Sequence, residues 1–205
     1  LNWNQRVNNN FSYTISGNAT FNNNQVVDLN GGQAIPGGGI GAAQGFTTYT
    51  DNGQPVGSFY VLRVIGVFNT VDEVQQYQNQ QGNLIQPNAK PGDFKYFDKN
   101  NDGKIDDADR VFAGSYQPVA YYGLNGTANY KRWDFSLAIY GNVGNEVYNG
   151  KKAVRVEGKD NVERDVVYNR WTSANRSQKE PGANVGNLPA SDYFVESGSF
   201  IRINN

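Results

Sequence analysis

The chain has 205 residues and a net charge of −1, with 18 Lys and Arg, 19 Asp and Glu, and no Cys, His or Met. The absence of Cys and His excludes disulfides, thiol nucleophiles, Ser-His-Asp triads and Cys- or His-ligated metals, and the near-zero charge provides no attraction for nucleic acid. Since the chain lacks an initiator Met, we expect a processed product or a piece of a longer protein.

The first predicted strand covers residues 11–22, where apolar and polar side chains alternate without interruption. A period of two is typical of a strand with two different faces. One face carries Phe11, Tyr13, Ile15, Gly17, Ala19 and Phe21; the other carries Ser12, Thr14, Ser16, Asn18, Thr20 and Asn22.

Two further alternating strands are predicted over residues 122–130 and 133–142. Only Lys131 and Arg132 separate them, which is the length of a tight hairpin turn, although neither residue is the Gly or Asn that such turns prefer. We therefore expect a hairpin over residues 121–143.

Two folds explain such strands. One is a soluble antiparallel sandwich with one buried face per sheet. The other is a transmembrane β-barrel, whose strands need about 9 to 11 residues, with an apolar lipid-facing side, aromatic residues at both ends and a polar lumen. The strand lengths, the uncharged apolar faces and the aromatic residues near strand ends favour the barrel. These aromatic residues are Phe11, Phe21, Tyr122, Tyr130 and Trp133.

The spacing of the strands supports the barrel, because outer-membrane barrels alternate short periplasmic turns with long extracellular loops. The sequence then predicts an incoming strand end and periplasmic turn over residues 1–10, extracellular loops over 23–120 and 144–199, and the start of another strand over 200–205. The fold class is thus all-β, part of a large antiparallel transmembrane β-barrel. Because the last strand stops at Asn205, we expect a fragment of a longer chain.

Within the loops, shorter elements are expected. Residues 31–45 are Gly-rich and indicate a flexible connection, and the apolar run 57–68 predicts a buried strand that anchors the first loop. Thr70 is a candidate cap for a short helix from Val71 to about Tyr77, and residues 160–171 predict a second helix with Trp171 packed at its end.

The first loop contains a motif with metal-binding chemistry at residues 98–109. Oxygen-bearing groups at loop positions 1, 3, 5, 7, 9 and 12, with Gly103 at position 6, match the calcium loop of an EF-hand, except that the last ligand is Asp rather than Glu. The predicted ligands are Asp98, Asn100, Asp102, the backbone carbonyl of Lys104, Asp106 and Asp109. Because the flanking segments look extended rather than helical, we expect a structural calcium clip.

An acidic surface turn without an ion is the alternative for this motif. The adjacent carboxylates Asp106/Asp107 or Asp72/Glu73 could in principle supply a glycosidase pair, but adjacent acids in loops are usually solvated. We therefore predict no catalytic residues and no enzyme activity.

The sequence resembles the SusC/RagA-like TonB-dependent outer-membrane transporters of Bacteroidota. The matching stretches run along the whole chain: Gly17-Asn18, residues 24–26, 53–60, 66–68 and 91–96, the acidic loop through Arg110, and residues 122–125, 135–137, 144–149, 170–172 and 190–202. The loop pattern of this family ends with an arginine, which corresponds to Arg110 in this sequence. Arg110 could pair with Asp107 or Asp109, or remain exposed to solvent.

The resemblance implies a 22-stranded barrel in the bacterial outer membrane with an N-terminal plug. It also implies import of glycans or peptides with energy from TonB, a SusD-like surface lipoprotein as partner, and contact with membrane lipid but not with nucleic acid. The plug and the TonB-contacting segment match nothing in this chain. The alternative function is that of a secreted, calcium-stabilised β-sandwich adhesin or carbohydrate-binding module.

Overall fold

The computed structural model describes residues 1–40, 44–155, 161–183, 186 and 188–204. The chain divides into two compact units. The sheet unit comprises Leu1–Gln25, Ser115–Val147 and Ser197–Asn205, and the loop unit comprises Val26–Gly114 and Tyr148–Glu196. None of the helices in these described ranges is long and apolar enough to span a membrane.

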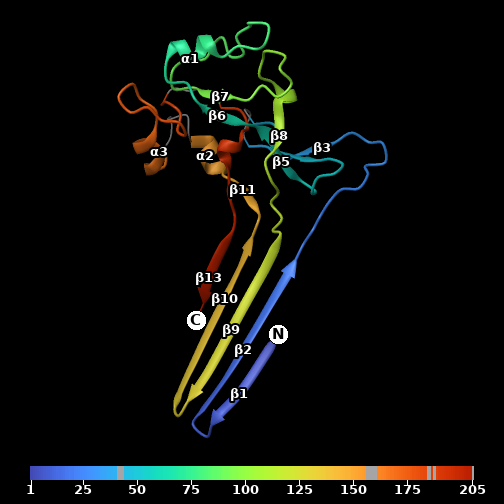
Figure 1. Cartoon of the computed structure of the whole chain (residues 1–205), viewed down its shortest axis with the longest axis vertical. Helices are drawn as coiled ribbons and strands as arrows, with labels where there is room; N and C mark the ends of the chain where they lie inside the picture. The colour runs from blue at the N-terminus through green and yellow to red at the C-terminus, as the bar shows by residue number, and fades with distance from the viewer. Residues whose placement is uncertain (41–43, 156–160, 184–185, 187, 205) are drawn as a thin grey trace. The chain divides into compact units, whose positions relative to one another are not determined.

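The sheet unit is one antiparallel sheet of five strands in the order β1-β2-β9-β10-β13 (Figure 1). The strands are β1 (Asn2–Asn8), β2 (Phe11–Phe21), β9 (Ala120–Tyr130), β10 (Trp133–Val143) and β13 (Phe200–Asn204). β2 and β10 each pair with β9 along their whole length of 11 residues. The observed strands differ from the expected ranges by no more than two residues at the ends of β2, β9 and β10.

Two tight turns close one end of this sheet. β1 turns into β2 through Asn9 and Asn10, and β9 turns into β10 through Lys131 and Arg132. Lys131 supplies the left-handed conformation that such a turn requires, with φ of 56°. Both long connections, from β2 to β9 and from β10 to β13, begin and end at the opposite end of the sheet.

The register places like residues side by side on each face. Ile15, Gly126 and Leu137 form one row across β2, β9 and β10, and directly opposite residues share a face. The large apolar side chains of the sheet remain exposed, including Trp133 at 68% and Phe135 at 59%. Within the described chain, therefore, no second layer covers the apolar face.

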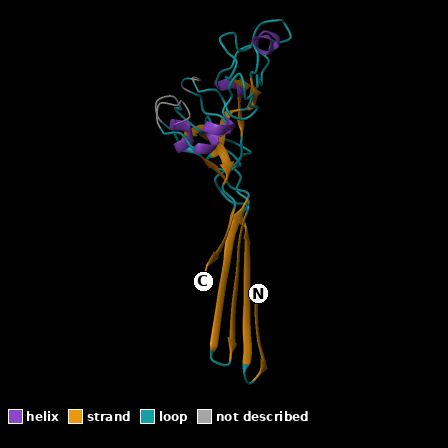
Figure 2. Cartoon of the chain, turned by 90° about the vertical axis from the view of Figure 1, so that its left-hand side faces the viewer, coloured by secondary structure: helices purple, strands orange, loops and turns teal. Residues whose placement is uncertain are grey.

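The loop unit contains short strands and helices in place of long strands (Figure 2). β3 (Ile35–Gly37), β4 (Thr48–Thr50), β5 (Ser58–Leu62) and β8 (Arg110–Phe112) form a four-stranded sheet, and β6 (Val64–Val67) pairs with β7 (Phe94–Tyr96). β11 (Glu146–Tyr148) pairs with β12 (Val195–Ser197), and each of these two strands includes a boundary of the loop unit. The helices are α1 (Val71–Gln76), α2 (Gly150–Arg155) and α3 (Arg164–Asn169), with 3₁₀ turns η1 (Asp107–Asp109) and η2 (Asp192–Phe194).

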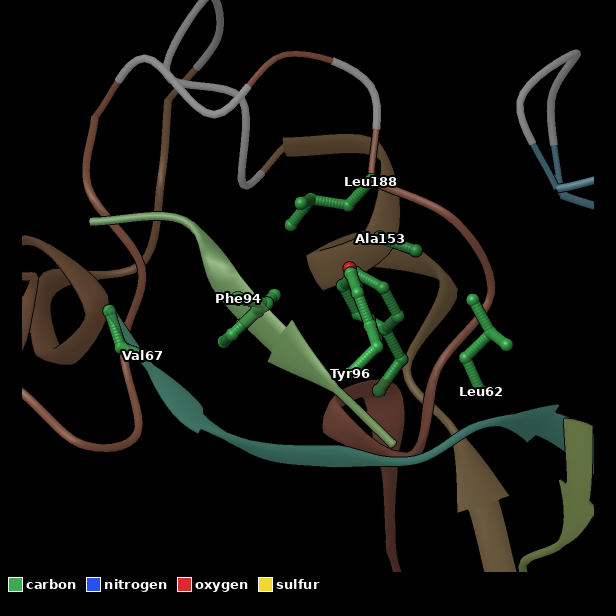
Figure 3. Close-up of a cluster of buried hydrophobic side chains, with 7 residues drawn as sticks. Leu62, Val67, Phe94, Tyr96, Ala153 and Leu188 are labelled. Atoms are coloured by element: carbon green, nitrogen blue, oxygen red, sulfur yellow. The ribbon is translucent and has the colours of Figure 1, made fainter. Parts of the chain in front are cut away.

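The core of the loop unit is a cluster of buried side chains around β7 (Figure 3). It draws on segments that are far apart in sequence, and Phe94 and Phe194 are essentially inaccessible, at 1% and 0% exposure. The members are Leu62, Val67, Phe94, Tyr96, Ala153, Leu188 and Phe194. This cluster anchors the loop unit, because it is where the non-polar surface leaves water.

The apolar run 57–68 forms two strands rather than the single expected one. β5 pairs with β8 and β6 pairs with β7, so the chain changes partner at the exposed residue Arg63. The backbone N–H of Val64 donates to the Asp192 carboxylate at 2.8 Å instead of to a strand. The tertiary pairing therefore divides a run that the sequence presents as continuous.

The first short helix begins as expected. Thr70 accepts a hydrogen bond from the backbone N–H of Glu73 at 3.1 Å, and α1 ends at Gln76. α3 lies within the predicted range 160–171, of which residue 160 lies outside the described residues, as do residues 41–43 of the Gly-rich segment and the predicted strand end at Asn205.

α2 was not anticipated. The sequence signal for its start is Asn149, since Asn is a favoured residue at the N-cap of a helix. In the structure the Asn149 side chain accepts a hydrogen bond from the backbone N–H of Lys152 at 2.9 Å.

Candidate functional site

The acidic loop, residues 98–109, connects β7 to β8 and is ordered by hydrogen bonds from its own backbone. Asp98 Oδ2 accepts from the N–H of Gly103 at 3.0 Å, Asn100 Oδ1 accepts from Asp102 at 3.0 Å, and Asp102 Oδ1 accepts from Lys104 at 3.1 Å. These local side-chain-to-backbone bonds are typical of Asp and Asn in tight turns. They give the loop a defined conformation through the chain's own groups.

Gly103, at the sixth position of the motif, has the geometry for which that position selects glycine. Its φ is +86°, and a Cβ built there would lie 2.4 Å from Nδ2 of Asn79. Both the left-handed backbone conformation and the close approach of the Asn79 side chain therefore favour glycine at this position. The sequence motif and the tertiary contact impose the same requirement.

Asp109 closes the loop. Its Oδ1 accepts from the N–H of Lys99 at 2.9 Å and its Oδ2 accepts from the N–H of Asp106 at 2.8 Å. The residue is 0% exposed, so its carboxylate is held entirely by backbone donors within the protein. The last predicted ligand thus joins the two ends of the acidic loop.

Lys104 partly neutralises the exposed side of the loop. Its ammonium lies 2.7 Å from Oδ2 of Asp106 and 3.7 Å from Oδ2 of Asp102. The hydrogen bond from Lys104 lowers the pKa of the Asp106 carboxyl and raises the pKa of the lysine. The Lys104 side chain therefore acts as a counter-ion, whereas the motif assigns a ligand role only to its backbone carbonyl.

The fit of the six predicted ligands to a metal is partial. Across the described residues, no group of three or more acidic side chains lies close enough together to hold an ion. One oxygen is nevertheless unsatisfied: Asp98 is 4% exposed, and its Oδ1 is buried without a hydrogen-bond partner. A buried carboxylate oxygen without a donor is costly, and oxygen donors of this kind are those that calcium prefers.

Arg110 fastens the acidic loop to the rest of the loop unit. Its Nε donates to Asp107 Oδ1 at 2.8 Å, and its Nη1 donates to the carbonyls of Phe46 at 3.0 Å and Tyr60 at 3.2 Å. The guanidinium also stacks over the Phe46 ring at 4.1 Å, and the residue is 7% exposed. The sequence left open whether Arg110 pairs with Asp107, pairs with Asp109 or is exposed to solvent. The structure shows the pairing with Asp107, and the prediction of a solvent-exposed arginine is wrong.

An aromatic ladder lies beside Arg110, and the sequence carries no local signal of it. Phe46 and Tyr49 stack with ring centroids 5.4 Å apart, and Tyr49 and Tyr60 stack at 4.8 Å. The rings of Tyr60 and Phe112 lie 4.9 Å apart and are tilted by 46°. Burial, together with the neighbouring Tyr49, raises the pKa of the Tyr60 hydroxyl. Because Tyr49, Tyr60 and Phe112 come from β4, β5 and β8, only the pairing of these strands brings their rings together.

The acidic loop also contacts the hydrophobic core. Ile105, the apolar residue between two predicted ligands, packs against the core cluster. Ile105 and Lys104 line a cavity of about 410 Å³ together with Asp93 and Tyr96. Burial raises the pKa of the Asp93 carboxyl, and the Tyr96 hydroxyl is buried without a hydrogen-bond partner. The conformation of the loop is therefore coupled to the packing of β7.

Three of the four carboxylates considered for a glycosidase pair have structural partners. Asp106 accepts from the N–H of Ala108 at 2.8 Å, Asp107 pairs with Arg110, and Glu73 accepts from the N–H of Asn69 at 2.7 Å. Each of these three groups serves a turn, an ion pair or a helix start.

The second candidate site is the sheet unit itself. Its apolar face ends at the turns in the aromatic row Phe11, Tyr130 and Trp133, which are in register, and the rings of Phe11 and Tyr130 lie 6.3 Å apart. The opposite face carries mainly Ser, Thr and Asn. Strands with one apolar and one polar face, and aromatic residues at the ends, are the construction of an outer-membrane barrel wall.

Comparison with known sequences finds similar bacterial receptors. No protein-family model matches it. It is 30% identical over 155 residues to TonB-dependent receptor P26 of Formosa agariphila, covering 74% of this chain and 15% of that protein. It is 26% identical to TonB-dependent receptor P3 of the same species, covering 97% and 20%, and 25% identical to the TonB-dependent receptor SusC of Bacteroides thetaiotaomicron, covering 95% and 18%.

Comparison with solved structures identifies the fold. The structure of the RagAB peptide transporter matches 98% of this chain and 21% of that chain, with a TM-score of 0.68 and 16% sequence identity. The RagAB peptide importer in the "open-open" state matches with a TM-score of 0.65 and 17% identity. The predicted fold class, an antiparallel barrel wall with long loops, is confirmed by this match. The chain spans about a fifth or less of each relative.

Proposed function

We propose a function from one premise: this chain belongs to the SusC/RagA-like TonB-dependent receptors of Bacteroidota. On that premise the chain is part of the barrel of an outer-membrane importer that takes up nutrients with energy from TonB. The sheet unit forms a section of the barrel wall, and the loop unit belongs to the extracellular surface.

The observation that carries this proposal is the exposed apolar face of the sheet unit. β2, β9 and β10 each contain 11 residues. Such strands are roughly 36 Å long, and at the tilt of about 45° found in barrels they cross the roughly 25 Å apolar band of the outer membrane. A soluble protein rarely leaves an apolar surface of this extent uncovered, whereas lipid accounts for it.

The orientation follows from the lengths of the connections. The turns at Asn9–Asn10 and Lys131–Arg132 would face the periplasm, because outer-membrane barrels have short periplasmic turns. Both segments of the loop unit, residues 26–114 and 148–196, would then be extracellular.

The partner and the substrate are further parts of the proposal. SusC of Bacteroides thetaiotaomicron is a TonB-dependent receptor, and RagAB is a peptide transporter. By analogy, the whole protein would pair with a SusD-like surface lipoprotein and import glycans or peptides. The extracellular loop unit is the part of this chain that such a lipoprotein would meet.

A pair of neighbouring substitutions on opposite faces tests the barrel. Leu137→Arg in the full-length receptor puts a charge on the apolar face, which costs about 2 to 4 kcal/mol at the bilayer midplane. The matched control, Ser136→Arg, puts the same side chain on the polar face. We expect Leu137→Arg to lower the amount of heat-modifiable receptor in the outer membrane and Ser136→Arg to leave it unchanged.

The barrel proposal fails if both variants assemble equally well, or if the receptor is a soluble monomer without detergent. The second result would favour the secreted β-sandwich module in its place.

We also propose that the acidic loop binds calcium. The support is the donor set of the motif, the left-handed Gly103 and the buried, unpaired Oδ1 of Asp98. Calcium would supply a counter-charge for these oxygens and stabilise the loop against opening.

Proteolysis of the full-length receptor tests the calcium proposal. Chelation is expected to raise cleavage within residues 98–109 several-fold, since the acidic side chains then repel one another. Asp98→Ala combined with Asp102→Ala should be cleaved equally with and without calcium. Asp72→Ala, which removes an exposed acid from α1, should behave like wild type. Identical cleavage of the wild-type loop with and without calcium would show that no ion is bound.

A further inference from the structure

The polar face of the sheet unit carries aromatic side chains at only one of its ends. In register, Tyr140 lies opposite Arg202, and in the next row Tyr121 and Phe200 lie on either side of Asn142. These residues come from β9, β10 and β13, at the end of the sheet from which the long connections depart. Toward the turns the same face carries mainly small groups, including Ser12, Thr14, Thr127 and Ser136.

Arg202 is positioned by its aromatic neighbours. Its Nη1 donates to the Tyr140 hydroxyl at 3.2 Å, and its guanidinium carbon lies 5.9 Å from the centre of the Tyr140 ring and 5.8 Å from that of Phe200. The two rings meet edge to face, with centroids 6.1 Å apart and an interplanar angle of 87°. The guanidinium is therefore held in place without being enclosed.

The cation of Arg202 has no acidic partner in the part of the chain that the structure describes, where the ion pairs involve Lys104, Arg110, Lys151 and Lys152. The one acid on this face of the described sheet is Asp134, which lies at the turn end and accepts a hydrogen bond from Asn129. The guanidinium thus retains donors that are free to bind a carboxylate in a fork-like, bidentate geometry.

We infer that Arg202, with Tyr140, Tyr121 and Phe200, forms a contact site for the carboxylate of an acidic oligosaccharide on the inner wall of the barrel. This inference rests on the proposed function, which makes the polar face the lumen. Arg202 would bind the carboxylate, and the exposed rings of Tyr121 at 47% and Phe200 at 42% would pack against the apolar faces of sugar rings.

The surrounding groups favour a sugar over a peptide. The same two rows carry Asn18, Thr20 and Asn142, whose amides and hydroxyl match sugar hydroxyls as both donors and acceptors. A site for peptides in general would gain little from a fixed row of small polar groups, because peptide side chains differ from one substrate to another.

Binding to the purified full-length receptor in detergent tests the inference, with tri-galacturonic acid and its methyl ester as one probe pair. We expect the acid to bind at least tenfold more tightly by calorimetry, with an affinity that falls as salt rises. Arg202→Gln should abolish the preference. The matched control Arg6→Gln removes an arginine from the turn end of the same face and should retain it.

A second probe pair, a tripeptide with a free C-terminus and its amide, separates sugar from peptide. A preference for the free tripeptide without one for tri-galacturonic acid overturns the assignment to a sugar. Equal binding of acid and ester, no binding of either, or a preference that survives Arg202→Gln overturns the site itself. If heat-modifiability first shows each variant to be a folded barrel, these failures leave the proposed function intact.

Discussion

Two adjacent buried charged residues, Asp109 and Arg110, fix the acidic loop to the rest of the loop unit. Asp109 accepts hydrogen bonds from two backbone N–H groups, and Arg110 donates to Asp107 and to the carbonyls of Phe46 and Tyr60. Each charge is thus compensated by hydrogen bonds whose loss would leave buried polar groups unpaired. The acidic loop is consequently part of the folded loop unit rather than an appendage to it.

Arg110→Lys tests this at the scale of one residue. A lysine keeps the charge, but its single ammonium cannot reproduce the planar set of donors to Asp107, Phe46 and Tyr60. We expect a loss of about 1 to 3 kcal/mol in the stability of the loop unit, seen as faster hydrogen exchange in β4, β5 and β8. Arg63→Lys, at an exposed position in the same unit, is the control and should change exchange little. Equal exchange in both variants would contradict the role given to Arg110.

Among the elements, those with a strong local sequence pattern were predicted correctly, whereas those that form only by pairing with a distant strand were not. β2, β9 and β10 follow from alternation, and α1 follows from the cap at Thr70. β3 lies inside a Gly-rich stretch and is a strand because it pairs with β4. The division of the apolar run at Arg63 has the same cause, because its two halves pair with strands of two different sheets.

The hairpin turn offers a test at the scale of an element. Lys131 holds φ of 56°, which costs a residue with a Cβ about 1 kcal/mol relative to glycine. Lys131→Gly should therefore stabilise the β9–β10 hairpin by up to about 1 kcal/mol, measured as a higher urea midpoint for unfolding in detergent micelles. Arg132→Gly should stabilise nothing, because Arg132 does not have a positive φ. A lower midpoint for Lys131→Gly would show that the lysine side chain matters more than the backbone conformation.

At the scale of the whole molecule, the two units are stabilised in different ways. The loop unit buries a hydrophobic core, whereas the sheet unit leaves its apolar face to the surroundings. Its strands are stabilised by pairing with each other and, in our proposal, by lipid.

Hydrogen exchange on the full-length receptor in micelles should separate these two modes of stabilisation. We expect the amides of β9, which pairs on both sides, to exchange at least tenfold more slowly than those of β3, an edge strand of three residues. The contrast should persist when calcium is removed, since β9 lies outside the acidic loop. Comparable rates in both strands would mean that the two units unfold together.

The sequence by itself determined the strands of the barrel wall, the apolar and polar sides of each, the tight turns and the glycine of the acidic loop, because these depend on local periodicity and backbone conformation. Only the tertiary structure decided which strands from distant parts of the chain are neighbours and which charges meet. The pairing of β2 with β9, the bonds of Arg110 to Phe46 and Tyr60, and the placing of Arg202 against Tyr140 all join residues far apart in the chain. Such contacts depend on the register between segments, and the residues themselves carry no local signal of it.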